Sequence, residues 1–204
     1  LLRTLEEEGL YTATPTYTSS ISTSQQTSVN TSRSVTHSGN GIYIEQAGNN
    51  NILTVDQEGN NNLIAGFPSS TNSISDANIT GNNNTTTLRQ DGENNVILFN
   101  ITGDYNTTTV DQGDGGHSDD NRAEFLIGGD YNTVDIKQRH NNGIGNNGHY
   151  IAIGISGDNN NVLTNQQNDG DKIGFILITG DDNDIDLIQQ GTGSHYVEID
   201  VGSN

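Results

Sequence analysis

The sequence of 204 residues contains no cysteine, no methionine and no tryptophan. Without cysteine, the chain has neither a disulfide framework nor thiolate chemistry. No apolar run reaches the roughly 18 residues that a membrane-spanning helix needs, so we expect no membrane insertion. Because methionine is missing even at position 1, we expect a processed chain, for example one that has lost a secretion signal, or a piece of a longer product.

Basic residues are also scarce. Seven Lys and Arg stand against 26 Asp and Glu, which gives a formal net charge of −19. Such a chain offers no basic surface to nucleic acid, and we expect no partner of that class. Only 29% of the residues are hydrophobic, a composition that would ordinarily indicate disorder. A regular repeat in the sequence favours an ordered rod instead, because inward side chains in a thin rod touch the coils above and below.

An asparagine and a glutamine recur six residues apart along the chain. The predicted structural ladder consists of the pairs Asn51 and Gln57, Asn84 and Gln90, Asn106 and Gln112, Asn132 and Gln138, Asn160 and Gln166, and Asn183 and Gln189. Self-similarity of this kind is typical of solenoids, in which each repeat packs only on its neighbours. The intervening residues alternate with a period of two, as in a strand, so the Asn and the Gln share the inward face. A buried amide is costly alone, but amides stacked in register can bond to each other.

A second type of segment alternates with the first and ends in an aliphatic residue where the first has Gln. Its end residues are Ile79, Ile101, Ile127, Ile155, Ile178 and Val201. From each of these residues to the next Gln the spacing is always 11, whereas the spacing from Gln to the next aliphatic end varies from 11 to 22. We therefore expect a rod with a tight turn of constant length along one edge and insertions along the other. Six such coils would give a rod roughly 30 Å long.

The segment 46–57 resembles a curlin repeat, because Gln46, Gly48, Asn51 and Gln57 follow the pattern Q-x-G-x-x-N-x5-Q. The first half of that pattern returns at 57–62 and 90–95, and the resemblance extends over about 39–202. The resemblance implies a two-stranded β-solenoid whose copies add end to end into extracellular, amyloid-like fibres. The chain departs from the pattern where Ile or Val replaces every second Gln and where turns are long, up to the stretch around 60–72.

These observations predict an all-β protein: a β-solenoid of about six coils, with two strands per coil, over residues 39–204. An extended N-terminal tail, 1–38, precedes it and is rich in Ser and Thr. Its alternating character around Tyr11 and Tyr17 suits an extended strand laid on another subunit, so we expect the tail to link subunits. A flexible, glycosylated linker is the alternative interpretation.

Two further surfaces are candidates for contact with other copies. The last strand, 195–201, has no cap in the sequence, and uncapped edges template further pairing. The outward positions of the aliphatic segments are strongly apolar, which predicts either an interface or a surface covered by loops from the variable edge. The candidate interface residues are Tyr11, Tyr17, Leu98, Phe175, Leu177, Tyr196, Val197 and Ile199.

No motif in the sequence indicates a catalytic, cofactor-binding or metal-binding set, so we predict a protein that is not an enzyme and needs no cofactor. The predicted function is that of a structural subunit of an extracellular filament, at a cell or virion surface. Copies of the chain itself are the expected partners, with glycans as a second class. The alternative is a virus appendage or surface adhesin whose rod displays loops to a receptor. An enzyme of the β-helix type would instead need a clustered acidic cleft along one face.

Overall fold

The computed structural model describes residues 39–68, 73–113, 119–139 and 148–202. These residues form strands and no helix, arranged in two parallel sheets. The first sheet, here sheet A, contains β1 (Gly41–Ile42), β2 (Ile44–Ala47), β4 (Leu63–Ala65), β5 (Ala77–Thr80), β7 (Val96–Thr102), β9 (Arg122–Gly128), β11 (Tyr150–Ala152), β13 (Lys172–Leu177) and β15 (His195–Asp200). The second, sheet B, contains β3 (Ile52–Asn60), β6 (Thr85–Glu93), β8 (Thr107–Gln112), β10 (Thr133–Arg139), β12 (Asn161–Gln167) and β14 (Asp184–Gln189).

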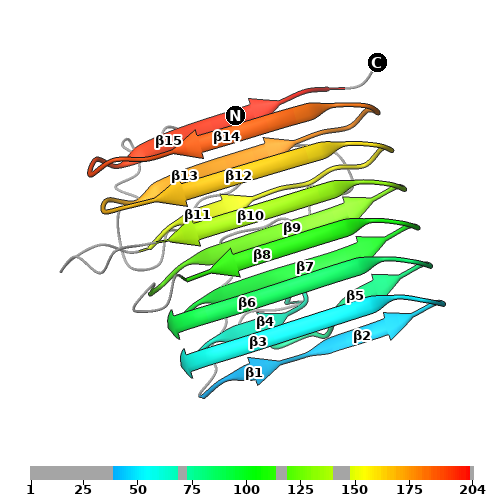
Figure 1. Ribbon diagram of the computed structural model, residues 1–204, viewed down its shortest axis with the longest axis horizontal. Helices are drawn as coiled ribbons and strands as arrows, with labels where there is room; N and C mark the ends of the chain where they lie inside the picture. Colours follow the sequence, from blue (N-terminus) through cyan, green and yellow to red (C-terminus); the bar gives the residue numbers. More distant parts are fainter. Residues whose placement is uncertain (1–38, 69–72, 114–118, 140–147, 203–204) are drawn as a thin grey trace.

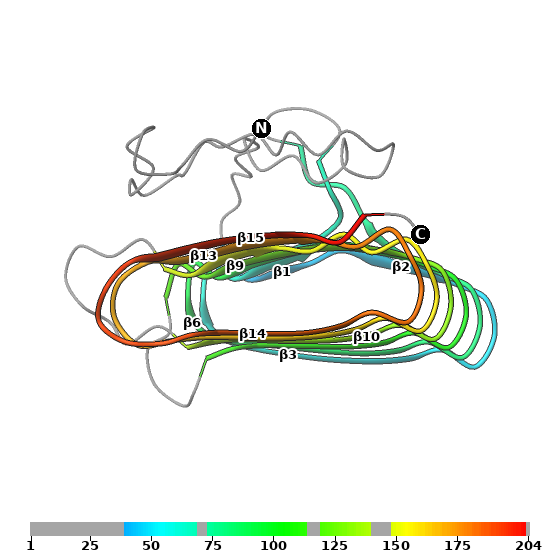
Figure 2. The same ribbon diagram turned by 90° about the horizontal axis from the view of Figure 1, so that it is seen from above.

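The chain winds alternately through the two sheets, so that each strand pairs with strands one coil away (Figure 1). Seen from above, the sheets form the two long sides of a flattened column (Figure 2). In sheet A, β1 and β2 share the first level, and β4 and β5 share the second. Six coils are therefore complete, and β15 adds a half coil on sheet A. The predicted solenoid of about six coils with two strands each is confirmed.

Register follows the repeat of the sequence. Gln57 pairs with Gln90, Gln90 with Gln112, and the same alignment continues through Gln138 to Gln166 and Gln189. A slip by one residue would turn each amide outward and a charged or polar neighbour inward, such as Arg89, Asp111 or Lys137. The burial of the amides therefore fixes the register.

The core lies between the two sheets. On the sheet A side it consists of aliphatic and aromatic side chains, among them Phe99 and Phe125, whose rings stack with centroids 5.0 Å apart. On the sheet B side, smaller residues such as Thr108 and Val110 lie between the Asn and Gln positions. Because every inward side chain contacts the coils on both sides, a chain with few hydrophobic residues still forms a dry interior.

The edge that joins sheet A to sheet B, here the fixed edge, has the same tight turn in each coil. Gly103 illustrates its constraint: its φ is +127°, and a Cβ there would lie 2.0 Å from the carbonyl oxygen of Gly129 in the next coil. The sequence predicted glycine here for its positive φ. The close approach between coils is a second reason, which only the structure supplies.

The opposite edge, here the variable edge, differs in length from coil to coil, as expected, but the longest insertion does not lie there, contrary to the prediction for the stretch around 60–72. It lies between β4 and β5, which share one level of sheet A, and its residues Phe67 and Ile74 pack on Leu63, Ala65 and Leu98. Those three side chains lie on the outward face of sheet A and are buried. For Leu98, a loop therefore covers part of the apolar surface, but this loop interrupts sheet A and does not come from the variable edge, contrary to the sequence-based interpretation.

Candidate functional site

The glutamine column runs through the interior of the rod. The Nε2 of Gln90 donates to the Oε1 of Gln112 at 3.0 Å, and the Nε2 of Gln112 donates to the Oε1 of Gln138 at 2.8 Å. The same bond joins every pair from Gln57 to Gln189, always from one coil to the next along the chain. Each Nε2 also donates to a backbone carbonyl of sheet A, such as Val96 for Gln112. The ladder predicted from the spacing is confirmed.

The asparagine column at the fixed edge is equally regular. The Oδ1 of Asn106 accepts from the backbone N–H of Asn132 at 2.9 Å, and its Nδ2 donates to the carbonyl of Gly129 at 2.9 Å. Asn51, Asn84, Asn132 and Asn160 make the same two bonds to the coil that follows each of them. Each coil is thus hydrogen-bonded to the next at a turn, where the strand ladder has already ended.

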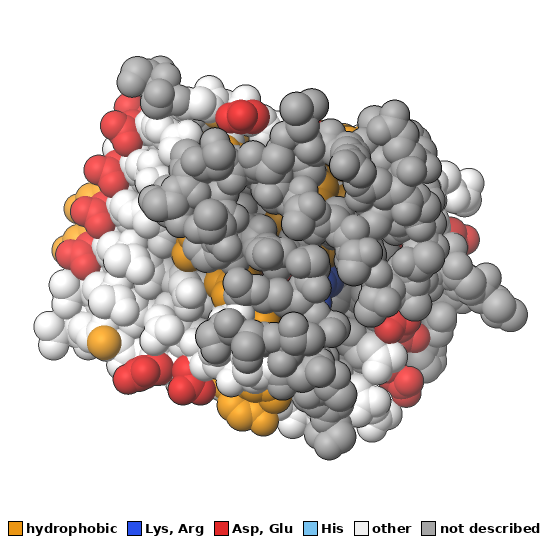
Figure 3. All heavy atoms as spheres, turned by 180° about the vertical axis from the view of Figure 1, so that it is seen from behind, with side chains coloured by type: hydrophobic (Ala, Val, Ile, Leu, Met, Phe, Trp, Pro, Cys, Tyr) orange, Lys and Arg blue, Asp and Glu red, His pale blue; other side chains and the backbone are white. Residues whose placement is uncertain are grey.

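A column of carboxylates follows the same edge, and sequence reasoning missed its role. The Oδ1 of Asp130 accepts from the backbone N–H of Asp104 at 2.7 Å, and Asp158 and Asp181 repeat this bond at 2.8 Å each. Asn82 Oδ1 performs the same role for the N–H of Asn49. Acidic side chains along this edge are visible in Figure 3. The hydrogen-bonded carboxylates link the turns of successive coils.

A second asparagine column, also missed, lies at the variable edge. The Oδ1 of Asn62 accepts from the N–H of Asn95 at 3.0 Å, and the Oδ1 of Asn40 accepts from the N–H of Asn62 at 3.0 Å. The column continues through Asn95 and Asn121 to the N–H of His149. The recurring Asn five residues after Gln57 and after Gln90 was the signal that could have revealed it.

Lys172 takes the place of an asparagine in that second column. Its residue is fully buried, and its Nζ donates to the carbonyls of Asp169, Gly170 and Gly193 at 2.6 to 2.8 Å. Burial lowers the pKa of Lys172, while the carboxylates of Asp171 and Asp169 act in the opposite direction. The ammonium group ties the loop before β13 to the loop before β15.

The two ends of the rod are chemically complementary. At the end formed by β3, no described donor reaches the Oε1 of Gln57, and Leu53 and Val55 are only half-buried. At the end formed by β14, Gln189 uses its Nε2 for the carbonyl of Ile173 alone, and Ile185 is half-buried. An acceptor thus faces outward at one end and a spare N–H at the other.

The candidate interface residues fall into three groups. Phe175 and Leu177 point outward from sheet A and are buried, and Phe175 packs with Tyr150 and with the half-buried Tyr196. Val197 and Ile199 point inward from the last half coil and pack on the core while remaining half-buried. Tyr11 and Tyr17, like the whole of the predicted tail 1–38, lie outside the described residues. Their role in an interface stays a prediction.

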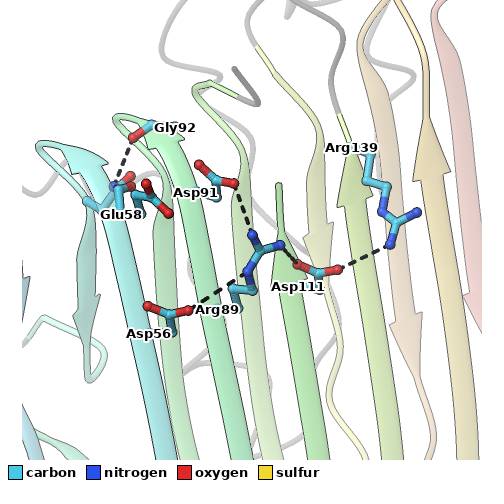
Figure 4. A network of polar contacts seen from close by, with 8 residues as sticks. Asp56, Glu58, Arg89, Asp91, Gly92, Asp111 and Arg139 are labelled. Atoms are coloured by element: carbon cyan, nitrogen blue, oxygen red, sulfur yellow. Dashed lines mark hydrogen bonds and ion pairs between the residues drawn. The ribbon is translucent and has the colours of Figure 1, made fainter. Parts of the chain in front are cut away.

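Charged side chains occupy the outward face of sheet B instead. Arg89 lies between Asp91, Asp111 and Asp56, at 3.0, 3.2 and 4.0 Å (Figure 4). Arg139 on β10 contacts Asp111 on the neighbouring strand β8 at 3.3 Å. Burial alone would lower the pKa of Arg89, but the surrounding carboxylates outweigh it and the pKa is raised. This network pairs both arginines of the outward face of sheet B with carboxylates.

Within residues 39–68, 73–113, 119–139 and 148–202, no three His, Asp or Glu side chains are placed to hold a metal ion. The same part of the chain contains no helix long and apolar enough to cross a membrane.

Comparison with known families bears on these columns directly. A family model described as the curlin associated repeat matches residues 81–113. The chain contains a curlin-type repeat. The matched stretch runs from the turn before β6, through β7, to the end of β8, and it includes both Gln90 and Gln112. No curated protein and no solved structure matches the chain. The repeat and the solenoid together point to a structural protein of the curli type.

Proposed function

We propose that the protein is a structural subunit of an extracellular filament, in which rods stack end to end and residues 1–38 contact the neighbouring subunit. The curlin repeat supports this proposal, because curli-type subunits associate with themselves into fibres. The extracellular location follows from the same resemblance.

The observation that carries the proposal is the polarity of the amide columns. Every Gln donates to the next coil along the chain, from Gln57 to Gln189. The end with a spare N–H at Gln189 therefore matches the end with an open acceptor at Gln57. Stacking in the same direction would continue the column across the joint, whereas stacking two like ends would oppose donor to donor or acceptor to acceptor.

Apolar area adds to this complementarity. Leu53 and Val55 at one end, and Ile185 at the other, belong to the same core but lack one neighbouring coil. Their half-buried state is the ordinary consequence of ending a solenoid without a polar cap. A second copy would bury them, and the hydrophobic effect would favour that contact.

The net charge of −19 opposes association. Like charges on approaching copies repel one another, and salt screens this repulsion over about 10 Å at 0.1 M ionic strength. Assembly should therefore be slow at low salt and faster at physiological salt.

The proposal is tested by assembly of the purified protein with a matched pair of variants in β14. Ile185→Lys places a charge on the end surface, whereas Ile188→Lys places it on the outward face of sheet B, where Ile188 is 55% exposed. Electron microscopy should show long filaments for the wild type and for Ile188→Lys, and none or few for Ile185→Lys. Fibre diffraction should give a repeat of about 4.8 Å along the filament axis. A wild type that remains monomeric under all salt conditions would contradict the filament.

The alternative, a rod that displays loops to a receptor, is favoured by one observation: the longest insertion, between β4 and β5, leaves the regular coil within sheet A. A display rod would be a monomer or a closed oligomer, so the same micrographs separate the two functions.

A further inference from the structure

The two sheets differ in length at one end of the rod. In sheet A, β15 pairs with β13 and extends the sheet by one level, while the described part of sheet B ends at β14. At the other end, β1 and β2 in sheet A and β3 in sheet B all belong to the first coil. When β15 of one copy meets β1 and β2 of the next, sheet B is therefore left one strand short at the joint.

The vacant position has a defined chemistry. On one side it faces the spare N–H of Gln189, and on the other side it faces the open Oε1 of Gln57. Between these amides it faces Ile185 and Leu187 of β14. A strand that fits here needs a Gln at its end and small or apolar inward residues before it. Without such a strand, two amides at the joint would be buried and unpaired.

The direction of the chain indicates which segment supplies that strand. Along the chain, every sheet B strand leads through the variable edge into sheet A, so the residues before β1 arrive from the side of sheet B. Gly39 occupies the turn position of Asn61, since Gly41 pairs with Leu63, and both residues have a positive φ, 77° and 57°. The next residue, Asn40, bonds to Asn62 as the second asparagine column requires.

Residues 19–25 carry the pattern of a sheet B strand. Their alternate residues are Ser19, Ile21, Thr23 and Gln25, and the Gln follows the first position by six residues, as in the repeat. The same order of a polar residue, an aliphatic residue, Thr and Gln appears in Asn160, just before β12, and in Val162, Thr164 and Gln166 of β12, and all four are buried. The segment 9–32 also contains no charged residue, although the chain as a whole carries −19.

The connection to β1 is long but compatible with the variable edge. Asn40 follows Gln25 by fifteen positions in the sequence. The corresponding distance is five positions from Gln57 to Asn62 and eleven positions from Gln138 to His149. The longer connection between Gln138 and His149 also lies at this edge, and additional loop length costs little entropy.

We propose that residues 19–25 form the missing strand of sheet B, parallel to β3 of their own copy and paired with β14 of the preceding copy. Strand β15 of one subunit and residues 19–25 of the next then make one composite coil. The occupant of the free β14 edge is a second copy of this chain. This inference rests on the proposed filament and specifies its joint.

Cysteine cross-linking tests the proposal cleanly, because the chain contains no cysteine. Aligned residues on adjacent parallel strands have Cα atoms about 4.8 Å apart, within the range that a disulfide spans. Mixing Gln25→Cys with Gln189→Cys before assembly should give a disulfide-linked dimer in the filaments. The matched control, Gln26→Cys with Gln189→Cys, points the thiol to the opposite face and should give about tenfold less dimer.

Growth rates provide the second measurement. Gln25→Leu interrupts the amide column at the joint, so elongation from wild-type seeds should slow about tenfold. Gln26→Leu should elongate at the wild-type rate, and thermal unfolding of both soluble variants shows whether the rod itself is intact. If filaments form normally but the Gln25→Cys and Gln189→Cys pair gives no cross-link and Gln25→Leu has no effect, the composite coil is wrong. The proposed filament is then still supported. If the wild-type protein forms no filaments, both the composite coil and the proposed filament are wrong.

Discussion

Sheets A and B contribute to one core but differ on their outward faces. All six residues of β13 in sheet A are buried, and β9 and β11 also bury outward residues such as Glu124, Tyr150 and Ala152. In sheet B, β8, β10 and β12 alternate between buried inward residues and partly or fully exposed outward ones. Sheet A is therefore built like a sheet covered on both faces, and sheet B like a sheet with one face in water.

The difference teaches that a single repeat can serve two tasks. Inward positions carry the amide and aliphatic columns that hold the coils in register, and the Gln column and the fixed-edge Asn column are the same from coil to coil. Outward positions are free to differ, and in sheet A they have become a second apolar layer centred on Phe175 and Leu98. An apolar surface of this extent is typical of a protein contact and not of a face exposed to solvent.

The largest expected effect is at that second layer. Phe175→Ala removes an aromatic ring that is 1% exposed, so it should lower the free energy of unfolding by about 3–5 kcal/mol. Thr109→Ala, on the outward face of sheet B, should change it by less than about 0.5 kcal/mol. Urea denaturation of both variants measures the comparison. Equal effects at the two sites would mean that the outward faces do not differ energetically.

A smaller difference is expected between the ion pairs of the two faces. In sheet A, Glu124 is fully buried beside Arg122, so Glu124→Gln should cost about 3 kcal/mol, nearly independent of salt. In sheet B, the Arg89 network is partly solvated, so Arg89→Ala should cost about 0.5–1 kcal/mol and less at 1 M salt. Stability measured at low and high ionic strength separates the two cases. If the effect of Glu124→Gln on the unfolding free energy depends strongly on salt, the ion pair is not shielded from solvent as the burial of this face of sheet A predicts.

The smallest effect concerns the pH dependence of Lys172 in sheet A. Its pKa is lowered by burial from an ordinary value of 10.5. Between the lowered pKa and 10.5 the unfolded chain binds more protons than the folded one, so stability should rise with pH in this window. The difference in unfolding free energy between the wild type and Lys172→Met should therefore grow in favour of the wild type as pH approaches 10.5. A difference that shrinks over this range would show that the three carbonyls outweigh desolvation.

The columns at Gln90, Gln112 and Asn106 could be predicted from the sequence, because a repeat stacked in register places equal residues above each other. The same spacing predicted two strands per coil and one edge of constant length. The second asparagine column escaped prediction because its members give way to His149 and Lys172, so the pattern is incomplete in the sequence. The carboxylate column escaped because an Asp in a turn has the same appearance whether it bonds to its own turn or to the next coil.

The sequence by itself determined the coil: its period, its register and the residues that face inward, since these depend only on a residue and its equivalents one coil away. Only the tertiary structure decided which outward residues are buried, that Lys172 is held by three carbonyls, and that sheet A extends one level beyond the described part of sheet B. Those properties depend on segments far apart in the chain that meet at an edge, a face or an end of the rod. No local pattern contains that information, because the hydrophobic effect and hydrogen bonding act on whatever the fold brings into contact.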